Sequence, residues 1–207
     1  MCLQSGHTVR GENDLGELAW IISFILADGT LTLKGFRIQI SEKNEKMCKI
    51  IMKKFKKIFK KDLKLIKRIN TNILQLKSKE IFIQLTKLGV EIGEKSHKVR
   101  IPKWILTHKS LLREFIGAWF DAEGTVKVRK FGKRRLLRLV MASKSEKLIR
   151  ELSIVLKKKF GICTWKWKEK DGIWRIEIKN SHIKNFLKEI PSRHPSKIQK
   201  IKEFFIS

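Results

Sequence analysis

LAWIISFILADGTL (Leu18–Leu31) and REFIGAWFDAEGTV (Arg113–Val126) are two versions of one sequence pattern. Each stretch leads through bulky apolar residues to an acidic residue, Asp28 in the first and Glu123 in the second, and each acid is followed by glycine. Apolar residues on all sides of a helical stretch indicate a buried helix. Two such stretches in register indicate a tandem duplication.

The duplication extends beyond these helices, because ISEKNEKM at residues 40–47 matches MASKSEKL at residues 141–148. Each copy continues with two strands, a basic amphipathic helix, a second hairpin and a third helix. The sequence therefore predicts an α+β protein of tandem αββαββα repeats, with two four-stranded antiparallel sheets and the two apolar helices packed at a pseudo-twofold interface. The first repeat is expected at residues 1–106, with a loose end at about 1–12, and the second at 107–207.

The composition is strongly basic. Lys and Arg number 48 against 20 acidic residues, so the formal net charge is +28 and the pI is about 10.3. This imbalance exceeds what solubility requires and predicts a polyanionic partner. The basic residues are interleaved with apolar ones along predicted strands and helices, which favours nucleic acid over a membrane surface.

Other patterns exclude several classes of protein. No stretch reaches the roughly 20 apolar residues that a transmembrane helix needs. The three cysteines have no CxxC spacing, so neither a disulfide framework nor a cysteine zinc site is expected, and an intracellular compartment is predicted.

The predicted strands carry polar side chains on alternate positions. A solvated sheet face is the ordinary explanation for such a pattern, but these side chains are types that reach phosphates and base edges. In the strand at Cys163–Glu169, Lys166 and Lys168 are expected on the polar face, opposite Trp165 and Trp167. The expected DNA contacts are Thr30, Thr32, Lys34, Arg37, Gln39, Ser41, Gln75, Lys77, Lys127, Arg129, Arg138, Lys166, Lys168, Arg175, Glu177 and Lys179.

Asp28 and Glu123 end their helices in an unusual way. A carboxylate at a helix C-terminus faces the negative end of the helix dipole, and the glycine after each acid is expected in the left-handed conformation that follows many helices. Small residues precede each acid at positions that would let the two helices approach closely. The two carboxylates would then lie side by side, as hard oxygen ligands suited to Mg²⁺.

These residues resemble the LAGLIDADG homing endonucleases, of the two-motif, archaeal-like, intron-encoded type. IISFILADG at Ile21–Gly29 and IGAWFDAEG at Ile116–Gly124 look like the two copies of the family's motif, and the repeat around them resembles the family's fold over nearly the whole chain. The departures are Leu26, where the family often has Asp, and Ile22 with Ser23, where it favours Gly and Ala.

The resemblance implies a saddle of two sheets on double-stranded DNA and hydrolysis that leaves a staggered break with short 3′ overhangs. It also implies that Asp28 and Glu123, assisted by the backbone carbonyls of Ala27 and Ala122, bind Mg²⁺, for which Mn²⁺ can substitute. A lysine near each scissile phosphate is expected at Lys95 and Lys197, with Lys98 and Lys200 as alternatives. Glu42 and Ser143 occupy positions where the family often has a residue that orients water.

Two other functions use the same scaffold. One is an intron RNA-binding maturase, and the other is a DNA-binding protein that does not cleave. Acids at both motif positions favour the nuclease, because a protein that only binds needs neither. A monomer without a protein partner is expected, because the second repeat supplies the partner helix.

Overall fold

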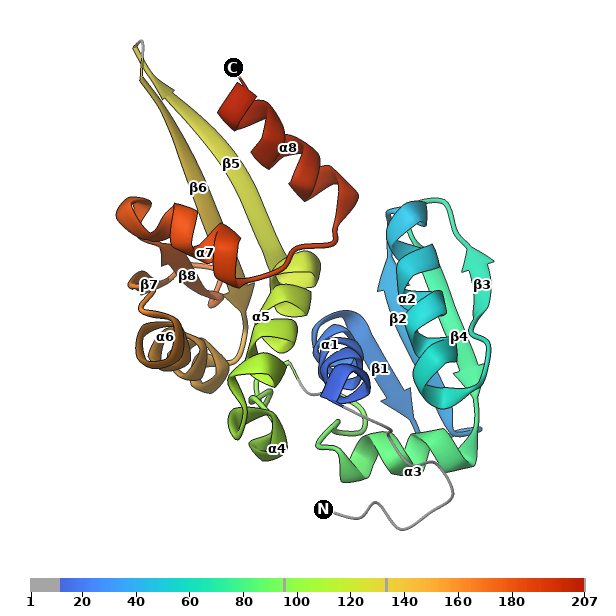
Figure 1. The fold of residues 1–207 in the computed structure, drawn as a ribbon. Coiled ribbons are helices and arrows are strands. Elements are labelled where there is room, and N and C mark those ends of the chain that lie inside the picture. Colours follow the sequence, from blue (N-terminus) through green and yellow to red (C-terminus); the bar gives the residue numbers. More distant parts are fainter. Residues whose placement is uncertain (1–11, 95, 133, 207) are drawn as a thin grey trace.

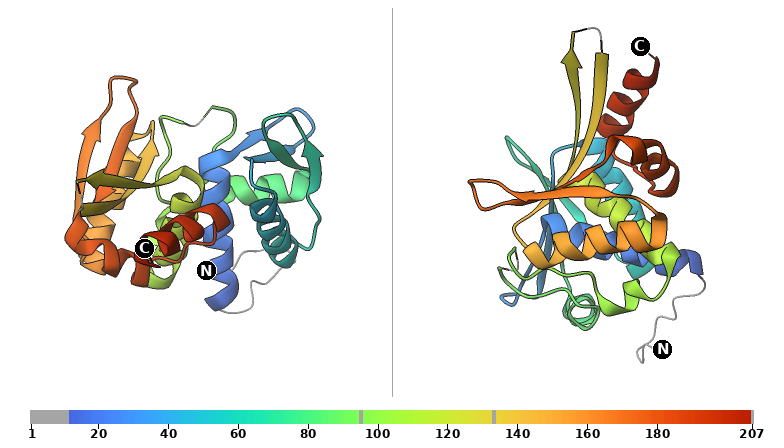
Figure 2. Two further views of the ribbon diagram at one scale, coloured as in Figure 1. Left: turned by 90° about the horizontal axis from the view of Figure 1, so that it is seen from above. Right: turned by 90° about the vertical axis from the view of Figure 1, so that its left-hand side faces the viewer.

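The computed structural model describes residues 12–94, 96–132 and 134–206. Two halves of similar construction lie side by side (Figures 1 and 2). The first half contains α1 (Glu12–Asp28), β1 (Gly29–Thr32), β2 (Arg37–Glu42), α2 (Glu45–Phe59), β3 (Lys64–Lys67), β4 (Asn72–Lys77) and α3 (Lys79–Lys87). A short helix, α4 (Lys103–Leu106), follows on the way to the second half.

The second half repeats this order with additions. It contains α5 (Lys109–Glu123), β5 (Gly124–Phe131), β6 (Arg134–Ser143), α6 (Glu146–Phe160), β7 (Thr164–Lys168), β8 (Trp174–Ile178), η1 (Asn180–His182), α7 (Ile183–Glu189) and α8 (Pro195–Ile206). The sequence pattern predicted one helix at Asn180–Ile190, where the structure has η1 and α7. It did not predict α4 or α8.

Both sheets are antiparallel and four-stranded, with strand orders β1-β2-β4-β3 and β5-β6-β8-β7. The predicted fold class, α+β with two such sheets, is therefore confirmed. Helix α2 packs on β2 and β4, and α6 packs on β6, β7 and β8, so each helix covers one face of its sheet. The opposite face of each sheet carries the polar side chains described below.

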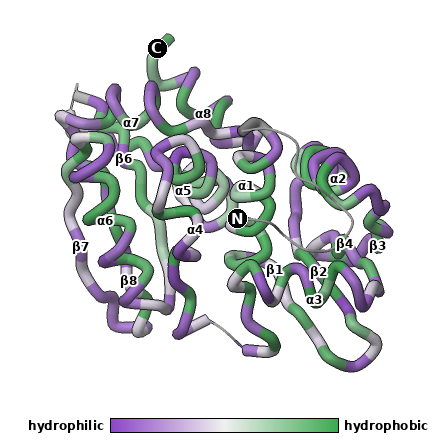
Figure 3. The backbone as a smooth tube through the Cα atoms, turned by 60° about the horizontal axis from the view of Figure 1, so that its bottom comes forward, coloured by the Kyte–Doolittle hydropathy of each residue, from purple (hydrophilic) through white to green (hydrophobic). Residues whose placement is uncertain are grey.

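Helices α1 and α5 pack against each other between the two sheets. Their side chains are buried nearly all round, as in Trp20, Phe24 and Phe115, and Figure 3 shows the hydrophobic residues of α1 near the centre of the molecule. Ser23, which departs from the family's small apolar residue, donates a hydrogen bond from Oγ to Phe115 O at 2.8 Å. The helix pair therefore accommodates a hydroxyl at its interface, because the hydroxyl is satisfied across that interface.

No helix among the described residues is both long and apolar enough to cross a lipid bilayer.

Candidate metal and nucleic-acid site

Asp28 is the last residue of α1 and Glu123 is the last residue of α5. A strand begins directly after each acid, at Gly29 and Gly124. The predicted left-handed conformation of these glycines is wrong: Gly124 is extended, with φ −84° and ψ 151°, and Gly29 is not among the glycines with positive φ.

The glycines are needed for space instead. A Cβ on Gly29 would lie 2.6 Å from Ile25 O, and a Cβ on Gly124 would lie 2.2 Å from Phe120 O. In each half, the backbone therefore turns from helix to strand in close contact with a carbonyl of the last helical turn. This tight exit leaves the carboxylates at the ends of two packed helices.

Beside these helix ends lies a cavity of about 560 Å³, lined by residues of both halves. The first half contributes residues from the end of α1, the end of β2, the β2–α2 loop and the β3–β4 turn. The second half contributes the end of α5, the start of β5, the residue before α8 and the first turn of α8. The lining residues are Asp28, Ser41, Glu42, Lys43, Asn44, Thr71, Asp121, Ala122, Gly124, His194, Ser196 and Lys197. Glu123 is not among them, although it is half-buried and interacts electrostatically with Lys197.

Lys197 lines this cavity and interacts electrostatically with acidic groups of both halves. Its Nζ donates to Phe120 O and to Asp121 O, both at 2.6 Å. Burial lowers the pKa of Lys197 to about 8, against the opposing effect of the carboxylates of Asp121, Glu42, Asp28 and Glu123. The ammonium group therefore neutralises part of the negative charge gathered at the end of α5.

The other lysines named from the sequence are placed differently. Lys200 and Lys98 are exposed and do not line the cavity, and Lys95 lies outside the described residues.

The residues expected to orient water differ between the halves. Glu42 lines the cavity and accepts a hydrogen bond from Asn44 N at 2.7 Å, and burial raises its pKa. Its Oε1 lies 4.0 Å from Nε2 of His194, whose pKa burial lowers to about 4, so the imidazole is neutral at pH 7. Ser143 is buried, accepts from Ser145 N at 3.0 Å and does not line this cavity.

The two carboxylates at the helix ends could bind a divalent metal only together with further oxygen ligands. Among the described residues, no three His, Cys, Asp or Glu side chains form a group that could hold a metal ion. The available groups are the carboxylates of Asp28 and Glu123 and the carbonyls of Ala27 and Ala122. These are hard oxygen ligands of the type that Mg²⁺ prefers, and Mg²⁺ commonly completes its coordination with water and substrate phosphates.

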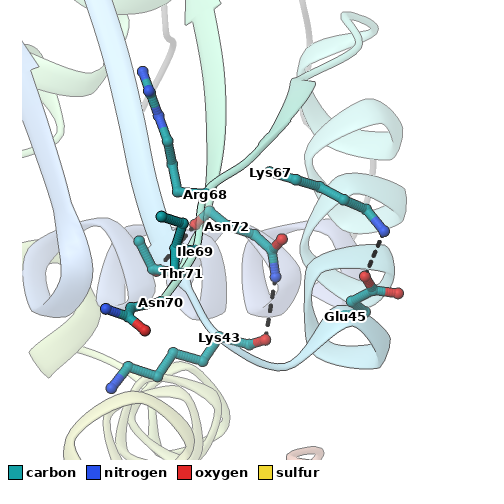
Figure 4. Close-up of a pocket in the computed structure, with 8 residues that line it drawn as sticks. All are labelled: Lys43, Glu45, Lys67, Arg68, Ile69, Asn70, Thr71 and Asn72. Atoms are coloured by element: carbon teal, nitrogen blue, oxygen red, sulfur yellow. Dashed lines mark hydrogen bonds and ion pairs between the residues drawn. The ribbon is translucent and has the colours of Figure 1, made fainter.

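A second cavity, of about 630 Å³, adjoins the first, because Lys43 and Thr71 line both. Its other residues come from α2 and the β3–β4 turn (Figure 4): Glu45, Lys67, Arg68, Ile69, Asn70 and Asn72. Lys67 is paired with Glu45 at 2.6 Å, whereas Lys43 and Arg68 have no acidic partner in the part of the chain that the structure describes. No motif or periodicity in the sequence predicted this basic turn.

The first sheet presents a polar face opposite α2. Cross-strand partners project from the same face of a sheet, and the pairs Thr30–Gln39, Gln39–Gln75 and Arg37–Lys77 are in register. Thr32 and Ser41 share that face by alternation, whereas Lys34 lies in the β1–β2 turn. The amide Nε2 of Gln39 donates to Oε1 of Gln75 at 3.0 Å.

On the second sheet, most of the expected polar face is also continuous. Lys127 pairs with Arg138, and Glu177 lies beside Arg138, with which it forms a salt bridge. Arg129, Arg175 and Lys179 fall on this face by alternation.

The expected placement of Lys166 and Lys168 is wrong. Lys166 pairs with buried Ile176, and Lys168 pairs with Trp174, so both lysines are on the helix-facing side of the sheet. Trp165 and Trp167 are on the polar face instead, opposite Glu177 and Arg175. Because β7 is an edge strand, lysines on its helix-facing side still reach solvent.

Trp165 is the most exposed aromatic side chain of this face, at 61%. The Nζ of Lys179 lies 4.2 Å from the centroid of its ring. The second sheet thus offers an aromatic surface with a cation beside it, and the equivalent strand of the first sheet, KLIK, has no aromatic residue.

Residues 110–191 match the LAGLIDADG-like domain family. No curated protein matches the sequence significantly. Among solved structures, a set of mesophilic variants from the homing endonuclease I-DmoI is similar over 88% of this chain and 99% of that chain, with a TM-score of 0.68 and 21% identity. I-DmoI in complex with DNA and Mn is similar over 88% of this chain and 99% of that chain, with a TM-score of 0.65 and 21% identity.

The same scaffold occurs in another protein. The N-terminal LAGLIDADG domain of DUF199/WhiA is similar over 94% of this chain and 90% of that chain, with a TM-score of 0.63 and 18% identity. Identities this low establish the fold and not the activity. Residues 110–191 thus resemble a LAGLIDADG-like domain, and the two halves together have the fold of I-DmoI.

Proposed function

We propose that this protein is a site-specific endonuclease that makes a staggered double-strand break in a long DNA target by metal-dependent hydrolysis. The observation that carries the proposal is that Asp28 and Glu123, one from each half, end two packed helices and both interact electrostatically with Lys197. An enzyme that cuts both strands needs acidic groups at two scissile phosphates, and this arrangement supplies one from each repeat.

The sheet faces support DNA as the substrate. The first sheet presents Lys, Arg, Gln and Thr side chains, the second presents Lys and Arg beside exposed Trp165, and two-stranded ribbons fit the major groove of B-DNA. The basic turn at Arg68 adjoins the acidic site, so the phosphate backbone would find unpaired cations beside the cleavage position. Structures of I-DmoI were determined in complex with DNA and Mn and with DNA and Ca, and a variant of I-DmoI was determined with its target DNA in the presence of 2 mM Mg.

The carboxylates of Asp28 and Glu123, with the carbonyls of Ala27 and Ala122, are the groups that would hold Mg²⁺ or Mn²⁺. A bound divalent ion would supply activation of the attacking water and stabilisation of charge on the leaving 3′ oxygen. Lys197 places its ammonium between the acidic groups of both halves, where it can donate to a phosphate oxygen. Glu42 lines the cavity and can orient water in the first half.

One chain contributes both acids, so the proposed enzyme works as a monomer with pseudo-twofold symmetry and needs no protein partner. A maturase or a DNA-binding protein without cleavage activity would use the same basic faces. Neither requires Asp28 and Glu123 at the helix ends, where burial raises the pKa of Glu123 and so disfavours its charged form.

A plasmid library with randomised inserts tests the proposal. Purified protein should linearise a subset of plasmids in Mg²⁺ or Mn²⁺, and sequencing of the cut ends should recover one related set of target sequences. EDTA should prevent cutting. A protein that retains and enriches DNA or intron RNA without cutting under any of these metals would refute the nuclease and support a binding function.

Base recognition by the first sheet gives a specific prediction. Gln39→Ala should relax the preference at one or two base pairs of the target, with a loss of roughly 1 to 3 kcal/mol there, if Gln39 reads a base edge. The measurement is the cleavage rate on a panel of single-base variants of the target.

Gln84→Ala is the matched control, since Gln84 is equally half-buried but lies on α3. A uniform loss for Gln39→Ala across the panel would assign Gln39 to a phosphate contact instead.

A further inference from the structure

The segment Pro191–Lys197, here called the strap, runs from α7 past the end of α5 to the first turn of α8 (Figure 1). One carboxylate binds its backbone. Asp121 accepts hydrogen bonds from Ser192 Oγ at 2.6 Å, from Arg193 N at 2.8 Å and from His194 N at 3.2 Å. Three donors of the strap therefore converge on one carboxylate of α5.

The close approach of the strap also depends on Gly117, which lies four positions before Asp121 and so on the same helix face. A Cβ at Gly117 would lie 2.2 Å from Pro191 O. In α1 the corresponding positions are Ile22 and Leu26, both buried and apolar. Packing of the two helices thus does not require Gly and Asp, and their presence in α5 has another cause.

Energetics point to the strap as that cause. Asp121 is 1% exposed. A buried carboxylate is strongly unfavourable unless hydrogen bonds compensate for its lost hydration, and here the donors Ser192, Arg193 and His194 all belong to the strap. Leu26 occupies the equivalent position in α1 without this desolvation cost. We therefore attribute the presence of Asp121 to its hydrogen bonds with the strap.

The strap carries groups that complete the shared site. Lys197 donates to Phe120 O and Asp121 O. Ser196 Oγ accepts from Asn44 Nδ2 at 3.2 Å, which links the strap to the first half. Arg193 forms a salt bridge with Glu114 at 2.8 Å. Displacement of the strap would therefore move Lys197 away from the acidic groups of both halves.

We propose that Asp121 is a positioning residue, which fixes the strap on α5 and thereby holds Lys197 at the cavity beside Asp28 and Glu123. The inference rests on the proposed nuclease function for its kinetic readout. It assigns to Asp121 no contact with DNA or metal.

A double-mutant cycle tests whether Asp121 acts through Lys197. In single-turnover cleavage, Asp121→Leu should slow the reaction about a hundredfold and Asp121→Asn about tenfold, because Asn keeps the shape and part of the bonding. DNA affinity in Ca²⁺ should change less than about twofold, because the basic sheet faces are untouched. The double variant Asp121→Leu with Lys197→Met should be no slower than Lys197→Met alone.

Hydrogen exchange of the free protein provides a readout that does not need cleavage. The amides of Arg193 and His194 should exchange faster in Asp121→Asn and Asp121→Leu than in the wild type. Asp62→Asn is the matched control, since Asp62 is an exposed surface partner of Lys56. If Asp121→Leu fails to fold, Ser192→Ala removes one strap bond and should show the same non-additivity with Lys197→Met at a smaller scale.

Additive effects of the Asp121 and Lys197 substitutions would overturn the inference, as would unchanged exchange at Arg193 and His194. Failure of the proposed function looks different. In that case the wild-type protein does not cut any library member, whereas the exchange of the strap still depends on Asp121.

Discussion

Asp28→Asn and Glu123→Gln are each expected to abolish double-strand cleavage or slow it at least about a thousandfold, because each removes a negative ligand needed for metal activation of water. The basic faces that hold DNA are unchanged, so affinity measured in Ca²⁺ should stay within about twofold of the wild type. The measurement is cleavage of the selected target in Mg²⁺ by the purified variants.

The matched controls for these substitutions are Asp62→Asn and Glu91→Gln, which change exposed carboxylates outside the site. Both should cleave at the wild-type rate. A wild-type cleavage rate for Asp28→Asn or Glu123→Gln would contradict the proposed role of that acid as a metal ligand.

The substitution of Glu123 should also affect stability. Burial raises the pKa of Glu123 above its usual value of 4.5, and Lys197 only partly opposes this. A carboxyl with a raised folded pKa stabilises the fold while protonated, and that contribution is lost as the pH rises through the folded pKa. Glu123→Gln should therefore raise the Tm of the metal-free protein at pH 7, and the gain should vanish below the usual pKa.

Gly117→Ala is expected to destabilise the fold by about 3 kcal/mol, because overpacking a close-packed contact forces neighbouring backbone to shift. The Cβ would lie 2.2 Å from Pro191 O, a backbone atom that cannot rotate away. The measurement is the urea midpoint of unfolding, converted to a free energy with the slope of the transition.

Gly16→Ala is the matched control, since Gly16 is also a buried helical glycine, on α1. Its Cβ would lie 3.4 Å from Cγ of Glu114, the side chain of which can give way. Alanine also gains up to about 1 kcal/mol of helix propensity over glycine. Gly16→Ala should therefore unfold at or above the wild-type midpoint, and equal midpoints for the two alanine variants would contradict the close seating of the strap.

Local patterns were sufficient to predict most of the fold. The repeated apolar stretches predicted α1 and α5, because the apolar residues that bury each helix and the acid that ends it are consecutive in the sequence. Alternation predicted the polar faces of β2 and β8, where Ile38, Ile40 and Ile176 mark the buried side.

The same alternation failed at β7. In TWKWK either set could face the core, and only the register with β8 shows that the tryptophans share the open face with Arg175 and Glu177. Propensity and periodicity do not encode which strand is an edge, so the exposure of Trp165 could not be predicted.

The strap was missed for a related reason. Asp121 is visible in the motif, but its partners Ser192 and Arg193 follow about 70 positions later in a stretch without periodicity. For Gly29 and Gly124, the sequence indicated that glycine is needed after each helix, but the predicted reason, a left-handed conformation, was wrong. Steric contact with Ile25 O and Phe120 O explains them, and such contacts appear only once the helix ends are placed.

The most direct test of the central claim, that Asp28 and Glu123 together cut the two strands of one DNA target, is to map both cut ends of the selected target at nucleotide resolution. The wild-type protein in Mg²⁺ should cut each strand once and leave short 3′ overhangs, and the variant with both Asp28→Asn and Glu123→Gln should leave the DNA intact. Blunt or 5′-extended ends, cutting in EDTA, or cutting by the double variant would contradict the claim.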